Sequence, residues 1–166
     1  MVVYRVVNLK HKDSTLSGIG AEKVGGRWNQ VGTRAVYCSE NISLALLEYY
    51  VHSENIALLP KEILVAKIEF PDDFIIEALN ELPEKWLQYP YSSSTMKVFT
   101  NLAKQRNFFA LKVPSSIVGL EYNIILNPLY KAFGKVEIKD FIKLPLDEPL
   151  IIGNSYFSGA RRKGYV

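Results

Sequence analysis

Residues 25–52 read GGRWNQVGTRAVYCSENISLALLEYYVH and combine features of a loop, a strand and a helix. The opening glycines among polar residues indicate a loop, whereas Arg34 to Cys38 has the apolar composition of a short strand. Residues 39–41 (Ser-Glu-Asn) supply helix-capping side chains and early negative charge ahead of a helical stretch from Ile42 to His52. The segment therefore predicts a glycine loop, a strand and a helix in that order.

The flanking sequence adds strands and a second helix. Short β-branched or strongly apolar segments predict strands at Val2–Val7, Lys61–Phe70, Phe108–Val113, Tyr122–Leu126 and Val136–Leu144. Leu16–Gly32 is loop-like because glycines recur among polar residues, and Pro83–Ser94 is a second loop. A helix is predicted from the capping residues 93–95 to Arg106. Because strands and helices do not alternate regularly, we expect one α+β domain with a mixed, largely antiparallel sheet.

The composition limits the class of protein. The chain has 166 residues, of which 48% are hydrophobic and 22% charged, as expected for one globular domain. Its single cysteine, Cys38, cannot form an internal disulfide, and with only His11 and His52 it cannot complete a four-ligand zinc site, so no metal is expected. No apolar run is long enough for a membrane helix, and the N-terminus does not resemble a signal peptide. We therefore expect a soluble protein of the reducing cytoplasm, without a membrane partner.

The net charge of +3 comes from one end of the chain. Residues 153–166 contain Arg161, Arg162 and Lys163 and no acidic residue, so residues 1–152 carry no net charge. The sequence predicts a folded domain over residues 1–152 and a solvated basic tail over residues 153–166. Direct nucleic-acid binding is not expected, because such domains carry their positive charge on the face that meets phosphate. A non-catalytic module that binds nucleic acid through this tail is the alternative.

Common catalytic motifs are absent. Gly18-Ile19-Gly20 lacks the third small residue of a dinucleotide-binding fingerprint, and no strong strand precedes it. The sequence contains neither a phosphate-binding loop ending in Gly-Lys-Ser/Thr nor a serine nucleophile elbow. A hydrolase triad would need His11 or His52, and the residues around them do not support that assignment.

The glycine loop and the helix after it carry the strongest chemical pattern. Gly25 and Gly26 permit close approach of the backbone to a ligand, and the adjacent Arg27 is suited to a forked contact with phosphate. Glu48 lies on the same helical face as apolar residues, at or beside the stripe expected to meet the core. An alternative reading is a structural ion pair between Arg27 and Glu48, or a Glu48 that merely borders the stripe.

Three stretches together resemble the RES domain family, which is named for its arginine, glutamate and serine. They are Tyr4-Arg5, the segment quoted above, and VPSSIVGLEYNIILNP at residues 113–128, and they stand in the family's order. The resemblance runs from about Tyr4 to Asp147. The family's closing acidic-x-arginine motif appears here as Asp-Glu-Pro at residues 147–149, without the arginine.

The resemblance implies a fold like that of ADP-ribosylating toxins and an enzyme that consumes NAD⁺. RES proteins are typically toxins of bacterial toxin–antitoxin pairs, neutralised by an Xre-type helix-turn-helix antitoxin with which they can form oligomers. They cleave the bond between nicotinamide and ribose, by phosphorolysis or hydrolysis, or they transfer ADP-ribose to a protein. On this reading NAD⁺ is a substrate, inorganic phosphate is a candidate co-substrate, and no resident cofactor is needed.

The resemblance also implies which residues act. It places Arg27, Tyr37, Glu48 and Ser115 in the functional set, and it adds supporting NAD⁺ contacts from Asn29, Ser39 and Asn123. Glu48 would stabilise the cation formed when the bond breaks, Arg27 would bind the diphosphate, and Tyr37 would stack on nicotinamide or hold the ribose. Ser115 would bind phosphate or ribose hydroxyls, with the neighbouring Ser116 as the alternative.

Overall fold

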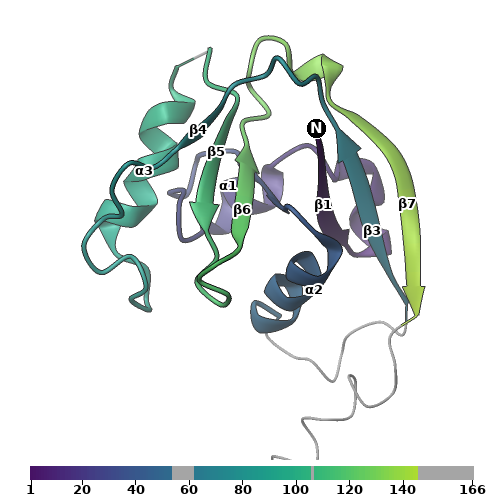
Figure 1. The fold of residues 1–166 in the computed structure, drawn as a ribbon, viewed down its shortest axis with the longest axis horizontal. Coiled ribbons are helices and arrows are strands. Elements are labelled where there is room, and N and C mark those ends of the chain that lie inside the picture. The colour runs from purple at the N-terminus through teal and green to yellow at the C-terminus, as the bar shows by residue number, and fades with distance from the viewer. Residues whose placement is uncertain (54–61, 106, 146–166) are drawn as a thin grey trace, which may run out of the picture.

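A seven-stranded sheet forms the centre of the protein, and its strands follow the order β4-β5-β6-β2-β1-β3-β7 (Figure 1). The computed structural model describes residues 1–53, 62–105 and 107–145. The strands are β1 (Val2–Val7), β2 (Val36–Ser39), β3 (Glu62–Glu69), β4 (Ile76–Ala78), β5 (Ala110–Pro114), β6 (Tyr122–Leu126) and β7 (Glu137–Pro145). Among the described strands β4 and β5 pair in parallel, and all other neighbouring strands are antiparallel. The predicted α+β fold with a mixed, largely antiparallel sheet is therefore confirmed.

Helices border the sheet, and two of them, α2 and α3, begin at a side-chain N-cap. They are α1 (Ile19–Val24), α2 (Ile42–Val51) and α3 (Ser93–Ala103), with short 3-10 turns at η1 (Leu9–Ser14) and η3 (Phe133–Lys135). Asn41 caps α2 by accepting a hydrogen bond of 2.7 Å from the amide of Leu44. Ser92 caps α3 through the amide of Thr95. No helix in the described ranges is long and apolar enough to span a membrane.

The sheet opens between β1 and β2. These strands are paired at a single position, Tyr4 with Ser39, whereas β1 pairs with β3 over six positions and β2 with β6 over four. Figure 1 shows β4, β5 and β6 on one side of this opening and β1, β3 and β7 on the other, with α2 below it. The N-terminal end of the protein thus supplies a strand that is only loosely attached to its neighbour β2.

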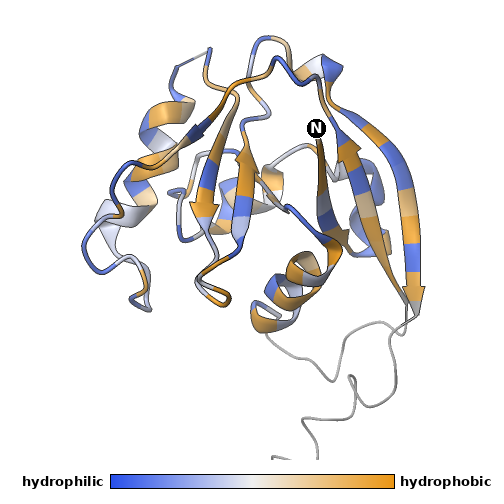
Figure 2. Ribbon diagram, in the orientation of Figure 1, coloured by the Kyte–Doolittle hydropathy of each residue, from blue (hydrophilic) through white to orange (hydrophobic). Residues whose placement is uncertain are grey.

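Two hydrophobic clusters pack on opposite faces of the sheet. Ile124 and Ile125 follow one another in β6, so their side chains point to opposite faces, and each belongs to a different cluster. Phe109 and Cys38 lie in the cluster with Ile124, and Figure 2 shows the hydrophobic colouring that continues along β1. Phe99 of α3 packs in the cluster with Ile125. Cys38 is buried in the first cluster as a small apolar residue.

Among the described α-helices and strands, α1 and β4 were not predicted from the sequence. Leu16–Gly32 was expected to be a loop, but it contains α1, because Gly18 and Gly25 adopt positive φ angles of 68° and 72° at the two ends of a short helix. The glycines therefore delimit the helix and do not prevent it. The strand β4 was also missed, since three residues carry little pattern and this strand is defined by its pairing with β5. The predicted basic tail and Arg106 lie outside the described residues.

Candidate functional site

A cavity of about 900 Å³ lies where β1 and β2 diverge. The glycine loop, both of these strands, α2, the loop after β4 and the turn after β5 contribute to its wall. The lining side chains on which the chemistry depends are Arg5, Arg27, Tyr37, Glu48, Tyr91 and Ser116. A cavity of this size and mixed polarity is suited to a small organic ligand.

Glu48 projects from α2 with 18% of its side chain exposed. Its Oε1 accepts hydrogen bonds from the Ser115 hydroxyl (2.8 Å) and the Asn123 side-chain amide (2.6 Å), and its Oε2 lies 3.2 Å from His52 Nε2. Burial acts to raise the pKa of Glu48, but hydrogen bonds from His52, Asn123 and Ser115 outweigh it and lower the pKa below the ordinary value. The carboxylate is therefore negatively charged at neutral pH.

Ser115 and Ser116 occupy different places. Ser115 is fully buried, and its hydroxyl accepts hydrogen bonds from the amides of Ile117 (3.1 Å) and Val118 (3.0 Å) while it donates to Glu48. The chain after Pro114 therefore makes a tight turn, which lies behind the carboxylate of Glu48. Ser116, in contrast, lines the cavity. The buried Ser115 orients Glu48, and the half-buried Ser116 is the serine that a ligand in the cavity can reach.

Strand pairing orients Asn123. Ser39 of β2 lies directly opposite Asn123 of β6, and its hydroxyl donates a 2.6 Å hydrogen bond to Asn123 Oδ1. The other end of the Asn123 amide is consequently directed at Glu48. Both residues line the cavity, as the sequence reading expected for ligand-contacting groups.

Tyr37 is fixed by the glycine loop. Its hydroxyl donates to Asn29 Oδ1 (2.7 Å) and accepts from the Trp28 amide (3.2 Å), and burial raises its pKa well above the ordinary value. Asn29 is fully buried, does not line the cavity, and donates through its side chain to the carbonyls of Ala21, Gln30 and Thr33. A Cβ atom on Gly26 would lie 2.7 Å from the Tyr37 hydroxyl. The glycine is therefore needed for this close approach.

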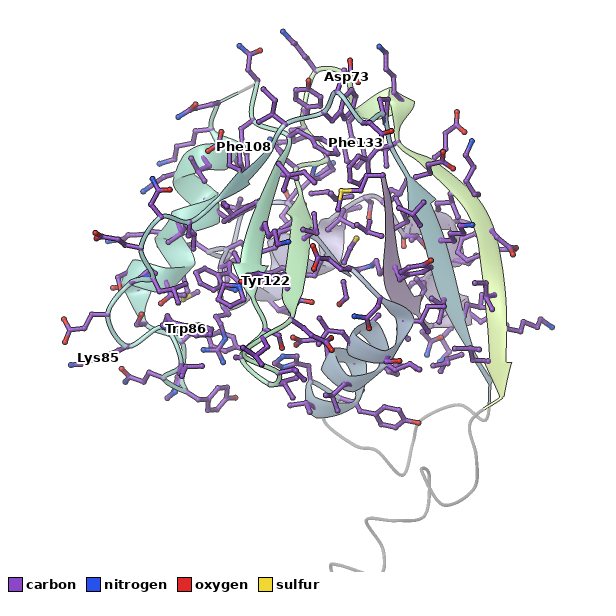
Figure 3. The ribbon with its side chains drawn as sticks, viewed as in Figure 1. Asp73, Lys85, Trp86, Phe108, Tyr122 and Phe133 are labelled. Carbon is purple, nitrogen blue, oxygen red and sulfur yellow. The ribbon has the colours of Figure 1, made fainter. Side chains whose placement is uncertain are left out.

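Arg27 faces the loop that follows β4. Its Nη1 donates to the carbonyl of Trp86 and, at 3.4 Å, to that of Gln88, and its guanidinium carbon lies 4.8 Å from the centre of the Tyr91 ring. Trp86, labelled in Figure 3 below α3, stacks on the buried Trp28 with ring centres 6.0 Å apart. Among the described residues Arg27 makes no ion pair with Glu48, so the structural ion pair considered above is not observed.

The sequence reading did not place two residues of the site. His52 contacts Glu48 at an i,i+4 spacing, a signal that could have linked the two side chains once the helix was predicted. Arg5 lies on the cavity wall, and its place in β1 falls on the same face as the buried Val3 and Val7. The sequence signal for Arg5 is a charged residue at a strand position where the pattern expects an apolar one.

The same region carries the sequence similarity to known proteins. The family model of the RES domain matches residues 2–147. The chain belongs to the RES domain family. The RES relatives include a protein named Toxin Res from Photorhabdus laumondii, 38% identical over 136 residues that cover 81% of this chain and 86% of the relative. Another Toxin Res, from Yersinia enterocolitica, is 35% identical, with 80% and 88% covered. A protein named Prs ADP-ribosylating toxin from Sphingobium is 36% identical, with 69% and 73% covered.

The structure brings the RES residues expected from the sequence into one place. Arg27, Tyr37 and Glu48 line the cavity of the RES domain, and Ser115 lies directly behind Glu48. The described residues contain no group of three or more histidine, cysteine or acidic side chains arranged to hold a metal ion. The chemically active side chains that line the cavity of the RES domain are the Glu48 carboxylate, the His52 imidazole and the guanidinium groups of Arg5 and Arg27, with hydroxyl and amide groups beside them.

Proposed function

We propose that this chain is a toxin that consumes NAD⁺ by cleaving the bond between nicotinamide and ribose. The observation that carries the proposal is Glu48, an ionised carboxylate on the wall of a ligand-sized cavity. Two of its contacts, Ser115 and Asn123, are neutral hydrogen-bond donors. Its third contact is His52, and among the described residues no arginine or lysine forms an ion pair with it. The negative charge is therefore held in position, as expected for a group that stabilises a developing cation.

The proposed reaction needs little proton transfer. When the C1′–N bond breaks, its electron pair goes to the pyridinium nitrogen, so nicotinamide leaves as a neutral molecule and the ribose acquires oxocarbenium character. Glu48 stabilises that positive charge, and Arg27 contacts the diphosphate. Tyr37, which also lines the cavity, stacks on nicotinamide or holds the ribose. The buried Ser115 acts through Glu48, and Ser116 is the serine that contacts phosphate or ribose hydroxyls.

The acceptor completes the reaction. Attack by inorganic phosphate on the anomeric carbon gives ADP-ribose 1″-phosphate, and attack by water gives ADP-ribose and a proton. The alternative is transfer of ADP-ribose to a nucleophilic side chain of a host-cell protein. This alternative is favoured by the Sphingobium relative, whose name describes an ADP-ribosylating toxin.

Incubation of the purified chain with NAD⁺ distinguishes these reactions. Release of nicotinamide without any protein acceptor supports phosphorolysis or hydrolysis, and stimulation by phosphate, with ADP-ribose 1″-phosphate as product, identifies phosphorolysis. Label that appears on cellular proteins from adenine-labelled NAD⁺ supports transfer. If neither nicotinamide nor labelled protein is produced, the proposal is wrong.

The proposed context is the bacterial cytoplasm, where NAD⁺ is available. There we propose that an Xre-type helix-turn-helix antitoxin binds the chain and neutralises it, and that larger assemblies form through this partner. A gene for such a small DNA-binding protein beside the gene for this chain would support the assignment.

A further inference from the structure

The loop that follows β4 is fastened to the glycine loop. Trp86, labelled in Figure 3, stacks on the buried Trp28 with ring centres 6.0 Å apart, and Arg27 donates a hydrogen bond to the Trp86 carbonyl. Two further residues of the loop, Tyr89 and Tyr91, line the cavity. Packing and hydrogen bonds therefore hold the segment that carries both tyrosines to the cavity wall.

Tyr91 lies within reach of both charged groups that the proposed reaction uses. Its ring centre is 4.8 Å from the guanidinium carbon of Arg27. Burial raises the pKa of the Tyr91 phenol, and the charges of Arg27 and Glu48 also act on it. A ligand whose reacting bond lies at Glu48 and whose phosphates lie at Arg27 therefore extends toward this loop.

Tyr89 presents an uncovered ring at the cavity. It is 81% exposed although it lines the cavity, and among the described residues Tyr91 is the aromatic side chain that packs against it, edge to face with ring centres 5.5 Å apart. The ring contributes little to the fold, because hydrophobic stabilisation scales with the apolar area removed from water. An aromatic ring held at a cavity wall is instead typical of a ligand contact.

The cavity has room for a ligand with two ring systems. Its volume of about 900 Å³ lies near the upper end of the roughly 300–1,000 Å³ usual for ligand pockets. The half of a dinucleotide that carries the reacting bond accounts for the part around Glu48. The part around Tyr89 is then left for the nucleoside on the far side of the diphosphate.

We propose that Tyr89 is the stacking surface for the adenine base of the ligand and thereby makes the site selective for a dinucleotide over a mononucleotide. Tyr91 is a positioning residue, because it contacts both Arg27 and Tyr89. Stacking suits this place, since a base has an aromatic face to offer while the tyrosine hydroxyl can stay in water. The identity of the base rests on the proposed function, in which NAD⁺ is the substrate.

Calorimetric titration with ADP-ribose and with ribose 5-phosphate, which has a sugar and a phosphate but no base, tests the proposal without any turnover. The variants are Tyr89→Ala, Tyr89→Phe and the control Leu87→Ala, which truncates an exposed side chain of the same loop that does not line the cavity. We expect Tyr89→Ala to weaken ADP-ribose binding about tenfold, the effect of losing one base–aromatic stack, and to leave ribose 5-phosphate binding unchanged. Tyr89→Phe and Leu87→Ala should bind ADP-ribose as wild type does.

Melting and kinetics separate this binding role from a structural one. Tyr89→Ala should melt at the wild-type temperature, because the ring is mostly exposed. Its KM for NAD⁺ should rise with kcat nearly unchanged, since the adenine lies away from the bond that breaks. Equal ADP-ribose affinities of Tyr89→Ala and wild type overturn the proposal, as does a wild type that binds ribose 5-phosphate as tightly as ADP-ribose. Tyr89-dependent ADP-ribose binding without NAD⁺ cleavage would instead overturn only the proposed function.

Discussion

At the scale of single residues, the charge of Glu48 separates catalysis from stability. Glu48→Gln keeps an oxygen that can accept from Ser115 and Asn123 but removes the negative charge. At neutral pH we expect a protein that melts only slightly below wild type, because it lacks the stability that the ionised carboxylate contributes. It should still bind NAD⁺ and cleave it about 10²–10³-fold more slowly, the usual effect of losing one electrostatic contact to a transition state. Melting temperature and nicotinamide release are measured together.

Glu40→Gln is the matched control, because Glu40 pairs with Lys112 at 2.6 Å and does not line the cavity. Its turnover should stay near the wild-type rate. A Glu48→Gln protein that melts far below wild type, with activity in proportion to the folded fraction, would assign Glu48 a structural role.

A second prediction concerns Arg27, where the shape of the side chain can be changed while its positive charge is kept. Arg27→Lys keeps the positive charge but cannot donate in a fork or stack on Tyr91 as a planar group. We expect the fold to persist and kcat/KM for NAD⁺ to fall by about tenfold or more, since hydrogen bonds to charged groups contribute about 1.5–3 kcal/mol. Steady-state kinetics measure this. Arg34→Lys, changed at the ion pair with Glu22, should be nearly neutral. Wild-type kinetics for Arg27→Lys would remove Arg27 from phosphate binding.

At the scale of elements, substitution of Gly26 in the glycine loop tests whether the backbone has to lie this close to Tyr37. A Cβ atom on Gly26 would meet the Tyr37 hydroxyl at 2.7 Å and Asn29 Oδ1 at 2.9 Å, whereas one on Gly20 in α1 would meet nothing within 4 Å. Gly26→Ala should therefore lower the melting temperature and disturb the Tyr37–Asn29 hydrogen bond, at a cost of about 1–3 kcal/mol. Gly20→Ala should be neutral or stabilising by up to about 1 kcal/mol. Equal melting temperatures for the two variants would contradict this account.

The elements also indicate what sequence patterns can and cannot reveal. The β1 and β6 strands and the start of α2 were predicted at the observed residues, because alternation and capping are local properties. The α1 helix was hidden by the glycines at its ends, and β4 by its dependence on a partner strand. The resemblance to the family singled out Arg27, Glu48 and Ser115 as candidate site residues. The burial of Ser115 behind Glu48 could not be predicted, since it depends on the packing of the turn after β5 against α2.

At the scale of the whole molecule, the cavity mouth is the natural point of control. Tyr89 and Val51 line the cavity and are 81% and 56% exposed, so apolar surface borders the entrance. A protein that covers this border would exclude NAD⁺ without unfolding the toxin. We expect a purified complex with the proposed antitoxin to have lost the proposed NAD⁺ cleavage while circular dichroism still reports the folded sheet. Cleavage by the complex at the rate of the free chain would contradict occlusion.

Acid stability is the second property of the whole molecule that depends on the site. Because the pKa of Glu48 is lowered by folding, the folded state holds fewer protons than the unfolded chain between that pKa and the ordinary value of 4.5. The stability that Glu48 contributes is fully present above pH 4.5 and is lost as the pH falls through the folded pKa.

Denaturant unfolding of wild type from pH 7 downward should show this loss of stability. The Glu48→Gln variant should not show it, because the glutamine amide does not titrate. The difference in unfolding free energy between the two proteins should therefore change as the pH falls below 4.5. A difference that is independent of pH over this range would mean that the hydrogen bonds of Ser115, Asn123 and His52 do not favour the ionised carboxylate.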